Sequence, residues 1–231
     1  MEKKDEMVPG RAMEDYLADI FRLQKESQDP HTAVATQEVA QRRKVSAAST
    51  TAMFKRLARE GLVAYREYQG VTLTPRGEQM ALQVLRRHRI VERFLTDILG
   101  ISWEEVDEMA HQMEHALPDP VVDAMERYLG DPRTCPHGFP IPDRQGYVDP
   151  LPRQTLAQVE PGQQAVISHV DERVEGLLAR LAQMDLHPGT ILKVLGRDPL
   201  DDLLVVEARG SRMTHLIGPR MAAGIFVRPL D

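Results

Sequence analysis

The chain has 231 residues, of which 42% are hydrophobic and 28% charged, as in an ordinary soluble globular protein. No apolar run approaches the roughly 18 residues that span a membrane, and the first ten residues lack a secretion-signal core. The net charge is −6, but residues 1–95 carry 17 Lys and Arg against 13 Asp and Glu, whereas residues 96–231 carry 12 against 22. We expect a cytoplasmic protein whose basic N-terminal part meets an anionic partner, the alternative being uneven surface charge.

Three predicted helices open the chain. Apolar residues at helical spacing predict a helix over residues 14–27, which the QDPH sequence at 28–31 ends. Thr36 is the expected N-cap of a short helix, QEVAQRR. Ser46 is the expected N-cap of a third helix, which Gly61 ends.

Residues 62–75 have the composition of a β-hairpin. They contain β-branched and aromatic residues on both sides of Gln69 and Gly70. Helix, helix, short turn, helix and hairpin is the element order of a winged helix-turn-helix domain.

The middle of the chain is predicted to be helical. Pro75 is suited to the first turn of a helix over about 75–98. Ser102 is the expected N-cap of a second helix that ends near Leu117–Pro118, and Asp119–Pro120 opens a third.

The last third of the chain is predicted to be rich in strands. Residues 131–154 contain six prolines in 24 residues, which indicates an irregular connector. Residues 155–231 alternate short apolar runs with turn signals, which predicts about five strands and a small barrel. Only ERVEGLLARLAQMDL, residues 172–186, has a helical pattern there.

The third predicted helix is a candidate recognition helix. It begins SAASTTAMFKR, and such small and hydroxyl residues allow close approach to a major groove and contacts to phosphates or base edges. Basic residues around it could contact phosphates. The alternative is a protein-interaction module. The expected DNA-binding residues are Thr36, Arg42, Arg43, Lys44, Ser46, Ala48, Ser49, Thr50, Thr51, Lys55, Arg66 and Gln69.

The sequence HQMEH is the strongest candidate for metal binding. His111, Glu114 and His115 fall at i, i+3 and i+4, so a helix would place them on one face. HQMEH also fits H-x-x-E-H, in which two His bind zinc and Glu is the base of a peptidase. A zinc hydrolase is therefore a rival hypothesis, and an adaptor with a structural metal is another. A hydrolase would need a third ligand and would leave the helix-turn-helix unexplained.

A second group of ligand types lies on the preceding helix. His88 and Glu92 fall at i and i+4, and Asp107 lies one turn before HQMEH. Facing helices that present imidazoles and carboxylates form a cage of N and O ligands. The alternative for His88 and Glu92 is a solvated basic face.

Order and spacing of these segments together are specific for one family. The chain resembles the diphtheria-toxin-repressor and manganese-transport-regulator family of metal-dependent transcriptional repressors over nearly its whole length. The resemblance rests on MEDYLADIF, VSAASTTAMFKRLAREGLV, YREYQGVTLTPRGEQMA, RRHRIVERFLTDILG, HQMEHAL and CPHGFPIP. The final 75 or so residues resemble the SH3-like, ferrous-iron-transport-A-type domain of longer members.

The resemblance implies a fold that is mainly α with a β C-terminal part. The expected segments are a winged helix-turn-helix DNA-binding domain over 1–75, a helical metal-binding and dimerisation domain over 76–145, a Pro-rich linker over 146–154 and an SH3-like barrel over 155–231. The single cysteine, Cys135, cannot form a disulfide within the chain and is expected to be structural or incidental.

The resemblance implies a first metal position formed by Asp15, His111, Glu114 and His115. Asp15 replaces a Met of the iron-responsive branch. His111 stands where that branch has Cys and the manganese branch has Glu. Carboxylates and imidazoles without sulfur suit Mn(II), with Fe(II) as the alternative. Ala18 stands where the manganese branch has Glu, so a binuclear site like that branch's is in doubt.

A second implied position combines His88, Glu92 and Asp107, the last replacing a His of the iron branch. Glu172 and Glu175 match the acidic and amide ligands that the SH3-like domain adds there, or they are a solvated helix start.

These features imply a homodimeric repressor of metal-homeostasis genes that binds palindromic DNA and is not an enzyme. A metal that joins Asp15 to the middle domain would set the spacing of two recognition helices, and half-sites repeat at multiples of about 34 Å. The dimer is expected to use apolar residues of the middle helices, unless these fill the domain's own core: Ile90, Phe94, Leu95, Ile98 and Leu99.

Overall fold

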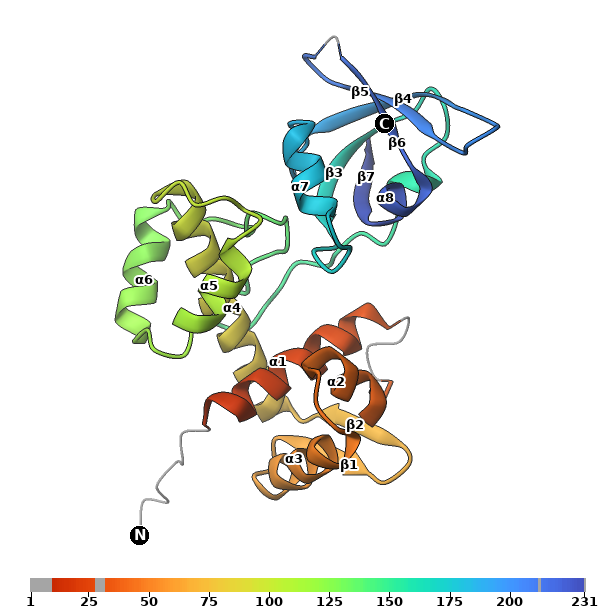
Figure 1. The fold of residues 1–231 in the computed structure, drawn as a ribbon. Helices are drawn as coiled ribbons and strands as arrows, with labels where there is room; N and C mark the ends of the chain where they lie inside the picture. Colours follow the sequence, from red (N-terminus) through yellow and green to blue (C-terminus); the bar gives the residue numbers. More distant parts are fainter. Residues whose placement is uncertain (1–9, 28–31, 212, 231) are drawn as a thin grey trace. The chain divides into compact units, whose positions relative to one another are not determined.

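The computed structural model describes residues 10–27, 32–211 and 213–230, which form two compact units (Figure 1). The first unit runs to Arg87 and adds residues 142–147, and the second contains residues 88–141 and those from Val148 onward. Two predictions concern residues outside the described ranges. One is the helix break at residues 28–31, and the other, for most of its length, is the absence of a secretion-signal core in the first ten residues. Among the described helices, none is long and apolar enough to cross a membrane.

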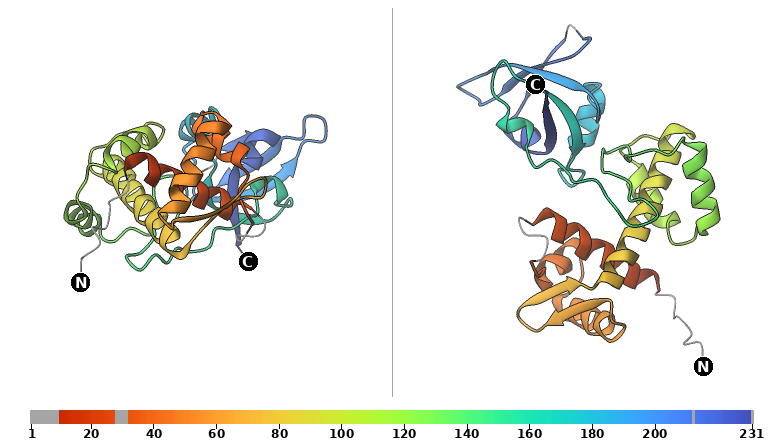
Figure 2. Two further views of the ribbon diagram at one scale, coloured as in Figure 1. Left: turned by 90° about the horizontal axis from the view of Figure 1, so that it is seen from below. Right: turned by 180° about the vertical axis from the view of Figure 1, so that it is seen from behind.

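The first unit has the predicted winged helix-turn-helix order. Its elements are α1 (Arg11–Glu26), α2 (Thr36–Arg43), α3 (Ala47–Arg59), β1 (Val63–Arg66) and β2 (Gly70–Leu73). The two strands pair antiparallel, and the hairpin lies against the helices (Figure 2). The predicted helices and the hairpin are therefore confirmed, with boundaries that differ by a few residues at α1.

The caps of α2 and α3 differ in chemistry. Ser46 caps α3 as predicted, because its Oγ accepts a hydrogen bond from the Ser49 amide at 3.1 Å. The predicted N-cap of α2 is wrong: Thr36 is the first helical residue and Ala35 is the N-cap. The Glu38 carboxylate accepts a hydrogen bond from the Ala35 amide at 2.8 Å and so satisfies this helix end without a hydroxyl cap.

The core of the first unit forms around α3. Phe54 and Leu57 are fully buried, and the Phe54 ring contacts the Tyr16 ring edge-on at 6.3 Å. A Cβ at Gly77, in the first turn of α4, would overlap the Leu62 carbonyl, so glycine allows the helix to contact the start of the wing directly. The start of α4 thereby packs directly against the start of the wing.

Helix α4 (Pro75–Asp97) begins in the first unit and continues into the second. There α5 (Val106–Met113) and α6 (Asp119–Tyr128) follow it, and the small core joins α4 to α5 through Val91, Leu95, Val106 and Ala110. Ile90 and Leu95 were candidates for a dimer interface, but both are buried within the chain. They therefore fill the core of the unit, which was the alternative. Ile98 and Leu99 are 41% and 58% exposed.

The predicted start of α5 is wrong. Ser102 was expected as its N-cap, but residues 102–105 form a turn in which the Glu105 amide donates to the Ser102 carbonyl at 2.9 Å. The helix begins at Val106 and ends at Met113, well before Leu117. This turn directs Trp103 into the core of the β-rich part of the unit.

The β-rich part has the predicted five strands. They are β3 (Gln164–Val170), β4 (Ile191–Arg197), β5 (Leu204–Ala208), β6 (Thr214–Ile217) and β7 (Ile225–Leu230), with the short helices η1 (Leu156–Gln158), α7 (Leu177–Gln183) and α8 (Pro219–Ala223). The strand order is β6-β5-β4-β3-β7, all antiparallel. The sheet is not closed, but its architecture fits the predicted SH3-like class.

The predicted helix over residues 172–186 is shorter in the structure. It covers only Leu177–Gln183, because Gly176 adopts a left-handed φ of 76° as its N-cap. Glu172 and Glu175 therefore lie in the turn before α7, not on a helix.

The Pro-rich connector contacts strand β3. The Val170 amide donates to the His137 carbonyl at 3.1 Å. Gly138, at φ +89°, lies so close to β3 that a Cβ would overlap the Ser168 carbonyl. The connector therefore places Cys135 and His137 beside α4.

Candidate metal centre and nucleic-acid interface

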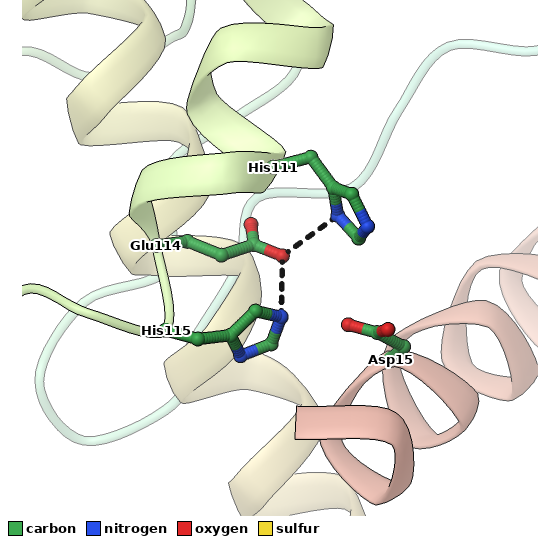
Figure 3. A group of neighbouring side chains, drawn as sticks. All are labelled: Asp15, His111, Glu114 and His115. Atoms are coloured by element: carbon green, nitrogen blue, oxygen red, sulfur yellow. Dashed lines mark hydrogen bonds and ion pairs between the residues drawn. The ribbon is translucent and has the colours of Figure 1, made fainter.

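Glu114 is the centre of the HQMEH cluster. Its Oε1 lies 3.0 Å from His111 Nδ1 and 3.1 Å from His115 Nε2 (Figure 3). Its Oε2 lies 2.7 Å from Nδ1 of His88 on α4. Glu114 is 3% exposed, so a buried carboxylate is surrounded by three imidazoles.

The local backbone that assembles HQMEH is not the continuous helix expected from the sequence. His111 lies in the last turn of α5, Glu114 is the C-cap, and His115 follows the helix. The Ala116 amide donates to the Met113 carbonyl at 2.9 Å, so a turn continues the helical path. The side chains of His111, Glu114 and His115 converge because this turn continues the helical spacing, which places residues three and four apart on one face.

His88 connects this cluster to two further carboxylates. Its Nε2 lies 3.1 Å from Asp107 Oδ1 and 3.5 Å from Glu92 Oε1. Burial lowers the pKa of His88, but Glu92, Asp107 and Glu114 outweigh it and hold the pKa well above its ordinary value. The structure thus brings together His88, Glu92 and Asp107, which the sequence grouped.

Glu92 also faces a histidine that the sequence analysis did not single out. His137 Nδ1 lies 3.0 Å from Glu92 Oε1, while His137 Nε2 donates to the Trp103 carbonyl at 2.6 Å. Neither Glu92 Oε1 nor His137 Nδ1 has a partner of hydrogen-bond geometry among the described residues. The Cys135 Sγ completes a fully buried group whose ligand atoms lie within 4.8 Å of one another.

The charges of this second group compensate each other. Burial lowers the pKa of His137, but Cys135 and Glu92 raise it to about 12. Burial raises the pKa of Glu92, but His88 and His137 hold it well below its usual range. The signal for this group in the sequence was Cys-x-His in CPHG, a spacing that places two metal-binding side chains in one turn. Cys135, which was expected to be structural or incidental, therefore has potential metal ligands as neighbours.

The two acidic residues of the β-rich part lie differently. Glu172 Oε2 is 3.5 Å from His137 Nδ1, so Glu172 approaches the second group. Glu175 is exposed, and no group of potential ligands found among the described residues contains it. Glu172 is not a member of such a group either, so the expectation that the two residues act as a ligand pair stays a prediction.

Asp15, also drawn in Figure 3, belongs to the first unit and lies on α1. It is 8% exposed, and its Oδ2 accepts a hydrogen bond from Arg43 Nη2 at 3.0 Å. Arg43 and Arg42 also bond to Asp19, at 2.8 Å and 3.1 Å. The carboxylate of Asp15 is thus connected to α2, the helix before the recognition helix.

These donor sets fit divalent transition metals. A carboxylate oxygen approached by two imidazoles provides N and O ligands, which suit Mn(II) and Fe(II), and the thiol of Cys135 adds a softer donor to the second group. Glu92 Oε1 and His137 Nδ1 are buried and lie 3.0 Å apart as an ion pair without hydrogen-bond geometry, so both remain available as ligand atoms for a metal.

The start of α3 presents a small, hydroxyl-bearing surface. Ser46, Ala48 and Ser49 are exposed, and Thr51 is half-buried. Thr50 is fully buried, and its hydroxyl donates to the Ser46 carbonyl at 3.2 Å. The expectation that Thr50 contacts DNA is wrong, because i−4 bonding and core packing use its side chain.

The basic residues fall into two groups. Arg42 and Arg43 are half-buried and bonded to carboxylates of α1, which compete with their expected phosphate contacts. The exposed group contains Lys44, Lys55 and the wing residue Arg66. Lys55 Nζ lies 3.6 Å from Glu67 Oε1 and forms an ion pair with it.

The wing tip carries a residue that the sequence analysis did not select. Tyr68 is fully exposed at φ +62°, a strained conformation for an aromatic residue, next to the exposed Gln69. Thr36 is half-buried at the start of α2. The exposed part of this surface is therefore the start of α3 together with the wing.

Three family models match successive segments of the chain. Residues 10–71 match the iron dependent repressor N-terminal DNA binding domain, and residues 74–143 match the iron dependent repressor metal binding and dimerisation domain. Residues 154–229 match the FeoA domain.

Individual relatives agree with these models. The chain is 35% identical over 127 residues to the iron-dependent repressor IdeR of Mycobacterium leprae, a match that covers 55% of this chain and 54% of that protein. It is 26% identical to the diphtheria toxin repressor of Corynebacterium jeikeium, over 79% of this chain and 84% of that protein. The chain thus spans about half the length of the first of these curated relatives. These relatives are repressors, and none of them supports the hydrolase alternative.

Solved structures extend the similarity to nearly the whole length of the chain. A manganese-dependent transcriptional repressor in complex with manganese is 32% identical, with a TM-score of 0.84, over 94% of this chain and 100% of that one. The manganese regulator SloR is 28% identical, with a TM-score of 0.71, over 97% of this chain and 100% of that one. In sequence, domain order and fold, the chain belongs to the iron-dependent repressor family of diphtheria toxin repressor, IdeR and the manganese-dependent repressors.

Proposed function

We propose that the protein is a transcriptional repressor of metal-homeostasis genes that binds a palindromic operator as a homodimer when a divalent metal is bound. The observation that carries the proposal is the convergence of His88, His111 and His115 on the buried carboxylate of Glu114, in a chain that also contains a winged helix-turn-helix.

We propose Asp15, His111, Glu114 and His115 as the first metal position. Their N and O donors suit Mn(II), with Fe(II) as the alternative, and the relative of TM-score 0.84 is named for manganese. A divalent cation bound there supplies the positive charge that lets two carboxylates share a site.

Asp15 gives this position a connection to the DNA-binding domain. Through Arg43 its carboxylate is bonded to α2, and α2 packs on α3. Holding Asp15 in place therefore restricts the orientation of the recognition helix. Metal binding that favours one orientation shifts the population toward it, and in a dimer this sets the separation of two recognition helices.

We place a second metal position at Glu92, Cys135 and His137, which Glu172 approaches. His88 and Asp107 adjoin it through Glu92 and complete the set of ligand types. The support is the burial of three ligand atoms of different chemistry within 4.8 Å of one another. His137 and Cys135 thus extend the ligand set that the sequence predicted.

Metal-dependent DNA affinity tests the proposal. A duplex selected from a random pool in the presence of Mn(II) would be titrated by fluorescence anisotropy with Mn(II), Fe(II) or a chelator. We expect Mn(II) to raise the affinity 10- to 100-fold, the usual range of allosteric coupling.

The Glu114→Gln variant should abolish this response, because the carboxylate that joins three imidazoles is lost. Glu104→Gln, in the exposed turn before α5, is the matched control and should respond like the unaltered chain. Thermal denaturation would verify that both variants fold. Equal DNA affinity of the unaltered chain in chelator and in Mn(II) would contradict the proposal.

A further inference from the structure

The second unit contains a cavity away from the start of α3. It has a volume of about 690 Å³ and lies among the end of α4, the turn before α5, the connector at residues 134–136, strand β3 and the loop before β4. Cavities of 300–1,000 Å³ are typical of small-molecule sites. The cavity is therefore large enough for a small organic molecule.

Three polar atoms of the residues that line this cavity are buried without a hydrogen-bond partner among the described residues. They are Thr96 Oγ1, Trp103 Nε1 and Arg93 Nε. Arg93 Nε lies 3.0 Å from Asp97 Oδ2, but this contact lacks hydrogen-bond geometry. The indole of Trp103 is 6% exposed and can only donate. Buried donors of this kind normally have an acceptor, but none of the described residues provides one for Trp103 Nε1 or Thr96 Oγ1, whereas Arg93 Nε has the Asp97 carboxylate as an ion-pair partner.

The charge of the cavity wall is opposite to that of its surroundings. Residues 96–231 carry 22 Asp and Glu, yet none lines the cavity among the residues that the structure describes. The wall carries the guanidinium groups of Arg93 and Arg228 and the imidazole of His187. His187 has Asp185 at 3.6 Å, and Asp185 is fully exposed. A wall rich in donors and poor in acceptors complements an anion.

The remaining wall is apolar. Ile101, Pro136, Ile167 and Pro188 line it, and the Trp103 ring contacts the His187 ring at 4.8 Å. Such surfaces bind the hydrocarbon part of a ligand through burial of apolar area. The wall therefore favours an organic anion over an inorganic one.

We propose that this cavity is a binding site for a small organic anion, whose carboxylate or phosphate group is held by Arg93 and Arg228 with the Trp103 indole and the Thr96 hydroxyl as further donors. This site shares only the lining residue Cys135 with the proposed metal positions and does not depend on the proposed DNA-binding function. Its neighbour Cys135 belongs to the second metal group, so a ligand here would lie next to that group.

The chain offers a built-in reporter, because Trp103 is its single tryptophan. Tryptophan fluorescence of the full-length chain with Mn(II) would be titrated with benzoate, phenyl phosphate, inorganic phosphate and the uncharged benzyl alcohol. Saturable changes are expected with benzoate or phenyl phosphate, and the stronger of the two identifies the anionic group. Benzyl alcohol and inorganic phosphate should bind at least ten-fold more weakly.

Arg228→Gln removes one cation from the exposed rim and should weaken binding of the preferred anion about ten-fold, as expected for one charge-assisted contact. Arg220→Gln, an exposed arginine of α8 outside the cavity, is the control and should bind normally. Thr96→Val tests the buried hydroxyl at nearly constant volume and should also weaken binding.

Two results would overturn the proposal. One is the absence of a saturable change with both organic anions up to roughly 10 mM, a concentration well above weak-site dissociation constants near 1 mM. The other is equal affinity of Arg228→Gln, Arg220→Gln and the unaltered chain, which would show that the anion binds elsewhere.

Discussion

His88 and Glu92 connect the two candidate metal positions. His88 contacts Glu114 through Nδ1 and approaches Asp107 and Glu92 through Nε2, and Glu92 in turn faces His137. The raised pKa values of His88 and His137 indicate that both imidazoles are protonated. Their positive charges then offset the negative charges of the buried carboxylates of Glu92 and Glu114. A metal ion replaces protons on such ligands, so metal affinity should fall as the pH is lowered.

The role of Cys135 can be tested by spectroscopy. In Cys135→Ser, the thiolate-to-cobalt charge-transfer absorption of the Co(II)-loaded chain should disappear, because Cys135 is the single cysteine and its Sγ lies within 4.8 Å of Glu92 and His137 ligand atoms. The variant should retain a Co(II) spectrum typical of N and O ligands at the HQMEH position. If the unaltered chain shows no charge-transfer band at saturating Co(II), Cys135 is not a ligand.

His169 should make the stability depend on pH. It is 5% exposed, its ring stacks on Phe226 at 4.3 Å, and burial lowers its pKa to about 4. Between pH 6.5 and 4 the unfolded chain binds a proton at this position and the folded chain does not, so stability falls as the pH falls. The cost at pH 5 is about 2 kcal/mol.

Substitution of this histidine provides the measurement. His169→Phe removes the titrating group and keeps an aromatic ring on Phe226. The melting temperature of His169→Phe minus that of the unaltered chain should therefore increase as the pH is lowered from 7 to 5. A difference that stays constant over this range would argue against a neutral, buried His169.

Among the elements, the connector over residues 135–141 determines how the β-rich part meets the helices. His137 and Gly138 contact the backbone of β3, and the Arg89 side chain donates to the Pro140 carbonyl at 2.5 Å. The connector has no regular secondary structure of its own, so its position depends on these contacts. It thereby carries Cys135 and His137 to Glu92.

A pair of glycine substitutions tests this contact. Gly138→Ala should destabilise the protein by about 3 kcal/mol or more, because its Cβ would overlap the Ser168 carbonyl and because the residue has φ +89°. Gly162→Ala has nearly the same φ, +91°, with nothing within 4 Å of the new Cβ, and should lose only about 1 kcal/mol. Chemical denaturation would measure both. Equal losses would indicate that backbone strain alone matters at Gly138.

At the scale of the whole molecule, the exposed turn that follows α4 is the surface we expect to bury in a homodimer. Ile98 and Leu99 in this turn remain 41% and 58% exposed, close in sequence to the core that α4 forms with α5. The matching family model is described as a metal binding and dimerisation domain. An exposed apolar pair within this domain is consistent with a surface for a second copy.

Leu99→Asp should therefore weaken the dimer at least ten-fold and reduce operator affinity, because one subunit then contacts one half-site. Leu200→Asp, at an 88% exposed leucine of the β-rich part, is the control and should remain dimeric. Sedimentation velocity would measure the oligomeric state. A Leu99→Asp chain that stays dimeric would place the interface elsewhere.

The sequence by itself determined the elements whose cause is local. Apolar spacing predicted α1, α3 and α4, the residues around Gln69–Gly70 predicted the wing, and turn signals predicted five C-terminal strands. It also grouped His111, Glu114 and His115 correctly, because residues three and four apart meet wherever the chain turns helically. The resemblance to metal-dependent repressors rested on the order of these same local segments.

Only the tertiary structure decided the features that depend on contacts between distant residues. Burial removed Thr50 from the DNA-binding surface, and ion pairs with α1 engaged Arg42 and Arg43. The late start of α5 and the approach of His137 to Glu92 follow from packing of Trp103 and the connector against the β-rich part. Local patterns fix which residues can share one turn, whereas long-range packing determines which of those turns meet.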